Sequence, residues 1–478
     1  MNDPKRLVRG LRLLAALSLC SVACVAQERA QDKRAWLAPD AAVSDDPRRV
    51  PARPGPRGPE GSIVLVGGRV FDATGTTVRD GTVVIERNRI KAVLPAGSRE
   101  WPAGARVIDV AGKTVMPGLI DLHTHLTYHE PNTPSLEVDD PGAAALRGAE
   151  RLRFYIESGI TSVRDVASSG TVPFNLKRWV AENRIPGPRV FAAGQLITGT
   201  GGHGAEGEWA DRCSAGALGD TRSIREASGP DDWREAVREQ FKRGADLIKL
   251  ASHFSREEVK AAVDEAHSLG LKVTVDAETF YIQWAVEAGV DSVEHPLPRT
   301  EETIRLMAKK HVDSVPTLVP YIYIFDLDGG YFDSTSRRFG FSKEANLEML
   351  RRLKRAGVRM GVGTDLVTDW FRYLPRAYIT ELKQFVAGGF SVPETLAAAT
   401  RTSAQILDMD DKLGTLEAGK LADVLVVDGR PDANLDDLAK VSLVIRDGNM
   451  VVENGRITLT PHVAVPEPKP EERAGLKW

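Results

Sequence analysis

The stretch that decides the fold is Val115-Met116-Pro117-Gly118-Leu119-Ile120-Asp121-Leu122-His123-Thr124-His125. It predicts a short buried strand that the chain enters through a Pro-Gly turn. Side chains alternate between the two faces of a strand, so His123 and His125 point to the same side at its carboxyl end. Two converging neutral imidazoles are half of a site for zinc or a similar divalent ion. The alternative is that both histidines lie on an exposed strand end.

Length and composition limit the class of protein. The chain has 478 residues, of which 42% are hydrophobic and 27% are charged. These fractions are typical of a soluble globular protein, and the length suits a barrel enzyme with a small accessory domain. The net charge of -3 and the isoelectric point of about 6.4 favour neither a nucleic-acid partner nor a membrane-surface role.

Residues 1–26 have the pattern of a secretory signal peptide. A basic segment precedes a short apolar run, and Cys24-Val25-Ala26 allows cleavage after Ala26. This pattern predicts export to a bacterial periplasm, with a lipid anchor on Cys24 as the alternative. Residues 27–60 are rich in Ala, Pro, Arg and Asp, which predicts a disordered linker. Because the other two cysteines lie in the leader, Cys213 is alone and no internal disulfide is expected.

Short strands bounded by Gly, Asn or Pro are expected near both ends of the chain. Residues 61–116 contain several of them, and similar strands return within residues 411–465. We expect these two segments to pair as one composite, β-sandwich-like domain beside the central domain. Residues 466–478 are predicted to be a tail.

Between these segments, residues 117–410 alternate between strands and helices. Eight strand–helix repeats, counted from the strand that carries His123, predict an α/β protein with a (β/α)8 TIM-like barrel. The other seven expected strands cover residues 161–166, 189–194, 247–250, 272–276, 292–295, 313–317 and 359–365. Helices are expected between them, such as residues 256–269, whose apolar side chains recur at helical spacing.

The carboxyl ends of barrel strands gather at one face, where catalytic groups lie. The residues at these strand ends that we predict to be metal ligands are His123, His125, Lys249, Asp276, His295 and Asp365. Plainer interpretations exist, since Lys249 could reach outward to solvent, His295 could be a hydrogen-bonded core histidine, and Asp365 could cap a helix. Their recurrence at strand ends far apart in the sequence favours the metal site.

Other side chains have expected places near the mouth of the barrel. The glycines of Gly201-Gly202-His203-Gly204 predict a tight loop that brings His203 over the mouth as a catalytic contact to the substrate, with an ordinary flexible loop as the alternative. Arg164 and Asp165 are expected to pair with each other below the mouth. Three tyrosines are candidates for lining the pocket, although aromatic packing is their more common role: Tyr128, Tyr321 and Tyr323.

These parts predict a hydrolytic reaction. A divalent ion lowers the pKa of bound water toward about 7 and polarises a carbonyl group. Asp365 would take the proton from that water as a general base and deliver it to the leaving nitrogen as a general acid. The expected reaction is hydrolytic cleavage of a C–N bond in a small molecule.

A series of motifs occurs in a specific order along the chain: Pro117-Gly118-Leu119-Ile120-Asp121-Leu122-His123-Thr124-His125, Gly159-Ile160-Thr161-Ser162-Val163-Arg164-Asp165, Gly201-Gly202-His203-Gly204, Ile248-Lys249, Ser292-Val293-Glu294-His295, Gly363-Thr364-Asp365 and Gly414-Thr415-Leu416-Glu417-Ala418-Gly419-Lys420-Leu421-Ala422-Asp423-Val424. Together they resemble the amidohydrolase superfamily, and within it the imidazolonepropionase-like branch that includes Xaa-Pro dipeptidases. The resemblance covers about residues 62–455.

The resemblance implies a barrel that holds one or two divalent ions, with zinc as the expected metal. His123, His125 and Asp365 would hold one ion. A carbamate on Lys249 would bridge to a second ion, which His295 would bind.

Asp276 departs from the family pattern. Members of this branch carry a metal-binding histidine at the end of strand five, where this chain has Val275-Asp276-Ala277-Glu278. A carboxylate also binds divalent ions, so Asp276 is predicted to be a substitute ligand that shifts the metal preference away from a pure zinc pair. The alternative is a second site that is weak or empty.

Two other functions compete with C–N bond hydrolysis at this point. One is a deaminase of the same fold with a single metal ion. The other is a degenerate barrel that binds a small molecule without turnover, which Asp276 favours and the intact remainder of the set opposes. A small-molecule substrate is the expected partner, and a homo-oligomer is possible for any of the three.

Overall fold

The computed structural model describes residues 58–130, 133–134, 137, 140–205, 223–328 and 342–458. The predicted signal peptide, nearly all of the predicted linker, Cys213 and the predicted tail lie outside these residues. None of the helices in the described part is long and apolar enough to cross a membrane.

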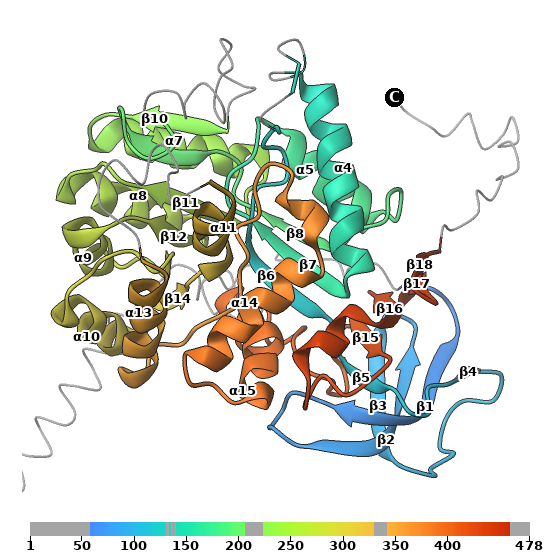
Figure 1. Cartoon of the computed structure of the whole chain (residues 1–478). Helices are drawn as coiled ribbons and strands as arrows, with labels where there is room; N and C mark the ends of the chain where they lie inside the picture. Colours follow the sequence, from blue (N-terminus) through green and yellow to red (C-terminus); the bar gives the residue numbers. More distant parts are fainter. Residues whose placement is uncertain are drawn as a thin grey trace, which may run out of the picture.

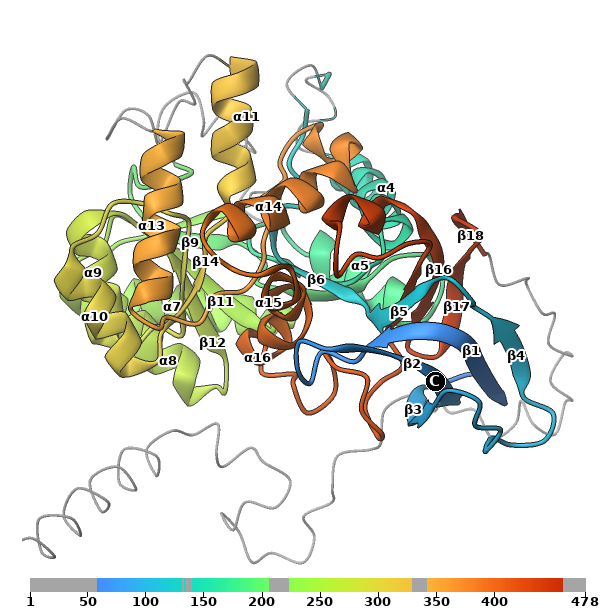
Figure 2. The ribbon, with the colours of Figure 1, turned by 60° about the horizontal axis from the view of Figure 1, so that its bottom comes forward.

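Strands from both ends of the chain form one sheet of nine strands. The strands from the amino-terminal side are β1 (Ser62–Phe71), β2 (Val78–Glu86), β3 (Arg89–Pro95), β4 (Arg106–Asp109) and β5 (Thr114–Pro117). Those from the carboxyl-terminal side are β15 (Val424–Val427), β16 (Val441–Arg446), β17 (Asn449–Glu453) and β18 (Arg456–Ile457). The join is the antiparallel pair β5–β15, in which Met116 lies opposite Leu425. Figures 1 and 2 show the blue and the red strands side by side at one end of the molecule.

The sheet is continuous, whereas the sequence predicts a sandwich-like unit. Its strand order is β18-β17-β16-β15-β5-β1-β2-β3, with β4 attached to β1 beside this path. The first half of β1 pairs with β4 at residues 63–66, and its second half pairs with β5 at Arg69 and Val70. One long strand thus serves both neighbours, and residues from both ends of the chain share one hydrophobic core, such as Leu65, Val83, Val424 and Leu443.

The central part of the chain forms two parallel sheets. One has the order β6-β7-β8 and the other β10-β9-β11-β12-β13-β14. Their strands are β6 (Leu119–Thr124), β7 (Ile160–Asp165), β8 (Arg189–Ala192), β9 (Leu196–Gly199), β10 (Ile224–Ala227), β11 (Leu247–Ala251), β12 (Lys272–Asp276), β13 (Ser292–Glu294) and β14 (Asp313–Val315). The sequence predicts seven of these nine strands and misses β9 and β10. Parallel strands have their carboxyl ends on the same side, so each sheet presents one functional edge.

Helices lie between the parallel strands along the chain and cover the outer faces of the two sheets (Figure 1). The α-helices are α4 (Pro141–Glu157), α5 (Val172–Ala181), α7 (Pro230–Arg243), α8 (Arg256–Ser268), α9 (Thr279–Ala288), α10 (Glu301–Lys310), α11 (Leu318–Asp328), α13 (Lys343–Arg355), α14 (Arg376–Ala387), α15 (Val392–Ala397) and α16 (Ser403–Ile406). The shorter helical segments are η1 (Trp370–Tyr373), the π-helix η2 (Ala398–Thr402) and η3 (Leu435–Ala439). The predicted apolar face of α8 is buried, and a capping box of Ser255 and Glu258 begins that helix.

The eighth expected strand, residues 359–365, is not a regular strand. It makes isolated bridges, Ser314 with Met360 and Thr124 with Leu366. Backbone hydrogen bonds nevertheless join it to both flanking strands: Leu122 N donates to Val362 O at 2.8 Å, and Gly361 N donates to Ser314 O at 3.0 Å.

This segment approaches both flanking strands closely and turns at Asp365. A Cβ atom on Gly363 would lie 2.8 Å from His123 Cβ and 2.6 Å from Val315 Cγ1, so only glycine allows the contact. Asp365 has a positive φ of 48°, and its backbone N–H donates to His123 O at 2.8 Å. The segment therefore turns away from the strand direction where it brings Asp365 beside His123.

Candidate active site

The predicted site residues come together at one face. His123, Lys249 and Asp276 lie in β6, β11 and β12, and His295 directly follows β13. Asp365 is the last residue of the segment 359–365, which lies between β14 and β6. A cavity of about 60 Å³ is lined on its polar side by His125, His203, Lys249, Asp276, His295 and Asp365. His123 is completely buried beside Asp365, which lines the cavity.

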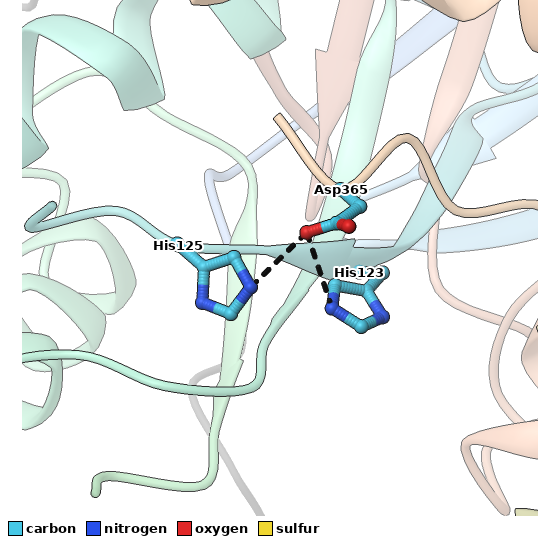
Figure 3. Close-up of side chains that lie close together, drawn as sticks. All are labelled: His123, His125 and Asp365. Carbon is cyan, nitrogen blue, oxygen red and sulfur yellow. Dashed lines mark ion pairs between the residues drawn. The ribbon is translucent and has the colours of Figure 1, made fainter. Parts of the chain in front are cut away.

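One cluster consists of His123, His125 and Asp365 (Figure 3). Asp365 Oδ1 lies 3.4 Å from His123 Nε2 and 3.1 Å from His125 Nε2. The three potential ligand atoms lie within 4.8 Å of one another. His123 Nε2 is buried and has no hydrogen-bond partner among the described residues. An unpaired buried nitrogen is costly unless something binds it, so this cluster fits a divalent ion.

The electrostatics of this cluster agree with a metal-binding role. Burial, and then the positive charge of Lys249, keep the pKa of His123 well below its usual value. Burial alone would raise the pKa of Asp365, but the neighbouring His123, His125 and His295 outweigh it and hold that pKa below its usual value. A neutral imidazole and an ionised carboxylate are the forms that coordinate a divalent ion.

A second cluster surrounds Asp276. Its Oδ2 atom lies 3.0 Å from His295 Nε2, 3.2 Å from His203 Nε2 and 3.7 Å from Lys249 Nζ. Lys249 is almost completely buried, and its Nζ has no hydrogen-bond partner in the described part of the chain. Although burial opposes ionisation, His295, His203 and Lys249 hold the pKa of Asp276 well below its usual value. One carboxylate oxygen thus connects three nitrogen-bearing side chains.

The expected pairing of Arg164 with Asp165 is wrong. Arg164 Nη2 donates to Glu294 Oε1 at 2.6 Å, whereas Asp165 accepts from Ser168 Oγ at 2.7 Å. Both residues lie in β7, and neighbours in a strand point to opposite faces, so their side chains diverge. Burial raises the pKa of Asp165 to about 6.

Two buried acids near the metal cluster were not among the predicted site residues. Glu294 Oε2 lies 2.7 Å from His123 Nδ1. Asp121 Oδ1 accepts from His123 N at 3.1 Å and from Thr364 N at 3.0 Å, and burial raises the pKa of Asp121 to about 7. The two-residue period that relates His123 to His125 also places Asp121 on their face of the strand. Nothing in the sequence indicates the contact of Glu294 with His123, because 171 positions separate them.

The loop with His203 depends on β9, which the sequence does not reveal. His203 N donates to Ser252 O at 2.7 Å, and a Cβ atom on Gly202 would lie 2.3 Å from that oxygen. The loop is therefore held against the end of β11, and His203 is directed at Asp276. The expectation that His203 reaches the mouth agrees with this position; its contact with a substrate stays a prediction.

The rest of the cavity lining is mostly apolar. The side chains there include Tyr128, Leu297, Tyr321, Ile324 and Trp370. Tyr128 stacks on His125 with ring centroids 4.3 Å apart. Of the three tyrosines considered from the sequence, Tyr128 and Tyr321 line the cavity, whereas Tyr323 packs edge-on against Trp370 and Tyr373.

Glu381 anchors the helix that supplies part of this apolar side. It lies in α14, is completely buried, and accepts from Leu318 N at 3.0 Å and Val319 N at 2.8 Å. These are the first two residues of α11, which carries Tyr321 and Ile324. Orphan N–H groups at a helix start need an acceptor, and here the acceptor comes from another helix.

We expect Glu381 to make stability depend on pH. Burial raises its pKa from 4.5 to about 8. Between these values the folded chain holds a proton that the unfolded chain has lost, so the free energy of unfolding falls as the pH rises through this window. Glu381→Gln cannot titrate and should remove this slope in urea unfolding measured across the same pH range. The exposed Glu235→Gln is the control and should keep it; an unchanged slope in Glu381→Gln would contradict the prediction.

A model of the amidohydrolase family matches residues 114–451. The chain belongs to this family. A 26% identical ochratoxinase from Aspergillus niger aligns over 347 residues, which are 66% of this chain and 70% of that protein. An imidazolonepropionase from Geobacillus sp. (strain WCH70) is 25% identical over 428 residues, covering 80% of this chain and 92% of that protein.

Solved structures agree with the sequence relatives. A prolidase complexed with N-methylphosphonate-L-proline is 29% identical, with a TM-score of 0.72 over 82% of this amidohydrolase and all of that chain. The motifs quoted above therefore identify the family and branch correctly, and the protein is an enzyme that acts on carbon–nitrogen bonds.

Proposed function

We propose that this amidohydrolase uses a divalent metal ion, expected to be zinc, to hydrolyse an amide or cyclic amide bond of a small molecule. The observation that carries the proposal is the compact cluster of His123, His125 and Asp365, with the unpaired His123 Nε2. An ion held there would lower the pKa of a water molecule and polarise the carbonyl group of the substrate.

Asp365 is the proposed general base and general acid. Its Oδ1 atom faces His123 and His125, while Oδ2 lies 3.7 Å from His295 Nδ1, and the residue lines the cavity. Because its neighbours keep the carboxyl group ionised, it can accept a proton from the attacking water. The protonated carboxyl group can then donate that proton to the leaving nitrogen. His203, which also lines the cavity, would orient the substrate.

We also propose that seven of the parallel strands (β6, β7, β8, β11, β12, β13 and β14) and residues 359–366 close into one eight-stranded barrel. The hydrogen bonds of Leu122 with Val362 and of Ser314 with Gly361 support closure on one side. On the other side, Asp246 N donates to Ala192 O at 2.9 Å, which links β8 to the start of β11. Closure would place all the ligands around one mouth.

The number of ions is the first property to measure. Lys249, Asp276 and His295 are the proposed ligands of a second ion, with a carbamate on Lys249 as the bridge that the family resemblance implies. However, Asp276 Oδ2 already contacts His203, His295 and Lys249. A second ion must displace these contacts, so we expect one tightly bound ion and one weakly bound ion.

Asp276→His tests this expectation. A neutral imidazole cannot form an ion pair with the Lys249 ammonium. Lys249 and His295 are therefore free to hold the second ion. Elemental analysis of the purified chain should give about one ion for the parent and about two for Asp276→His. Asp276→Asn keeps the size of the side chain without adding an imidazole, so its metal content should stay near one ion per chain. Two tightly bound ions in the parent would instead make Asp276 a full ligand, and no ion in any variant would contradict metal-dependent hydrolysis.

The cavity suggests which substrates to try. Its apolar side would take an uncharged or aromatic group, while the cluster of His123, His125 and Asp365 would receive the amide. The relatives named ochratoxinase, imidazolonepropionase and prolidase suggest a panel of N-acyl amino acids, cyclic amides and Xaa-Pro dipeptides. Among the described residues, His123, His125 and Asp365 alone form a group of three ligand atoms close enough to share an ion, which also favours a mononuclear deaminase as a second candidate. Release of ammonia from an amino-substituted heterocycle would reveal that activity.

We further propose that the enzyme is exported and acts in a periplasm. The basic and apolar pattern of residues 1–26 supports this location, with Cys24 as a possible lipid attachment point. A small molecule is its proposed partner, and a homo-oligomer is compatible with the exposed helices around the sheets. Fractionation of cells that express the full chain, followed by mass spectrometry of the mature amino terminus, tests both forms of export.

A further inference from the structure

A buried chain of hydrogen bonds connects Arg164, Glu294 and His123 behind the metal cluster. Glu294 Oε1 accepts from Arg164 Nη2 at 2.6 Å, and Glu294 Oε2 lies 2.7 Å from His123 Nδ1. Thr274 Oγ1 also donates to Glu294 Oε1. Glu294 is completely buried, and Arg164 is nearly so. None of these contacts reaches the cavity, so Glu294 cannot touch a substrate.

An ionised carboxylate accepts hydrogen bonds and donates none. The Nδ1 atom of His123 must therefore carry the proton in this contact, which leaves the lone pair on Nε2. Nε2 is the atom that lies 3.4 Å from Asp365 Oδ1 and has no hydrogen-bond partner among the described residues. The carboxylate thus selects the tautomer whose free nitrogen faces the cluster.

We propose that Glu294 is a positioning residue for the metal, which fixes the tautomer and the ring orientation of His123, and that Arg164 holds the Glu294 side chain in the orientation this requires. This inference rests on the proposed metal-dependent function. It assigns a role to two residues outside the predicted ligand set.

The arginine is necessary because of burial. A carboxylate without a partner cation would be costly at this depth. Arg164 Nε also donates to Leu122 O, the backbone next to His123 in β6. One guanidinium therefore holds both the carboxylate and the strand that carries the histidine.

The arrangement also joins neighbouring strands. Glu294 lies in β13 and its three partners lie in β6, β7 and β12. A purely structural role would strengthen the fold without changing how His123 binds an ion, so the test must measure the ion itself.

The test compares Glu294→Gln with the parent. The amide keeps the shape but carries no charge and can turn its NH2 group toward Nδ1. Competition with a chelator should show metal affinity about 10- to 100-fold weaker, the usual effect of losing such a partner of a ligand. The visible spectrum of the Co2+-loaded chain should also change. Arg164→Lys keeps the positive charge, whereas Arg164→Met removes it. The metal affinity of Arg164→Lys should therefore be closer to that of the parent.

Asp313→Asn is the matched control. Asp313 is also a buried acid paired with an arginine, at 2.7 Å from Arg359, but it begins β14 and lies at the opposite end of the strands from the site. Asp313→Asn should lower the stability of the fold and leave metal affinity and the Co2+ spectrum unchanged.

A measurement on the unsubstituted chain keeps the inference testable if Glu294→Gln does not fold. Nitrogen-15 NMR of the zinc-loaded parent should show a slowly exchanging proton on His123 Nδ1. If this proton is absent, the proposed role of Glu294 is wrong. The same holds if Glu294→Gln has the metal affinity and the Co2+ spectrum of the parent. If the parent itself binds no ion, the proposed function fails instead, so the two failures are distinguishable.

Discussion

Replacing Asp365 by asparagine is expected to lower kcat by about 10²- to 10⁴-fold, the range for loss of a general base. Asparagine keeps the size of the side chain but cannot take a proton from water. It also removes the negative charge that faces both His123 and His125, so the ion should bind less tightly as well. The measurement is steady-state kinetics on the best substrate of the amide panel, with metal saturating.

Metal content must be measured in the same samples to separate the two effects. If Asp365→Asn regains parental kcat when metal is added in excess, Asp365 is a ligand and not the base. Asp313→Asn should leave kcat unchanged, because its carboxylate pairs with Arg359 away from the cavity. A kcat for Asp365→Asn within a few-fold of the parent at full metal loading would contradict the proposed mechanism.

Removing the metal is expected to have the second large effect. After treatment with a chelator, activity should disappear and the melting temperature should fall. The cluster brings two imidazoles and a carboxylate into close contact, and an ion at 1,000 times its dissociation constant contributes about 4.1 kcal/mol to folding. Differential scanning calorimetry with and without chelator measures this loss.

Restoring the ion tests its identity. Zinc should restore both activity and stability, whereas magnesium should restore neither, because magnesium prefers oxygen ligands and keeps its water. Full activity in a chain that elemental analysis shows to be free of metal would exclude metal-dependent hydrolysis. Recovery with several transition metals would support the site and leave zinc as one of its ions.

The alternation of strands and helices is readable from the sequence because each element has its own period. The two-residue spacing of His123 and His125 and the helical spacing within 256–269 come from local geometry, which needs no knowledge of the fold. A parallel topology places strand ends together, so the sequence alone is enough to group Lys249, Asp276 and His295 with the two histidines. The motifs around them identify the family correctly.

Other features depend on contacts between distant segments. The two strands β9 and β10 are only four residues each, and short strands lack a strong periodic signal. The segment 359–365 has the composition of a strand, yet it makes only an isolated bridge, and Asp365 at its end has a positive φ of 48°. The partner of Arg164 could not be chosen from the sequence, although the alternation of side chains already argues against Asp165.

The sequence by itself determined the residue types of the site, their order around the parallel strands and the family, because these follow from local periods and from motifs along the chain. Only the tertiary structure decided which atoms meet. It put Glu294 against His123, Asp276 among three nitrogen-bearing side chains, and Glu381 at the start of α11. The physical reason is that buried polar groups take their partners from whichever strand or helix packs beside them, and packing is set by the whole fold.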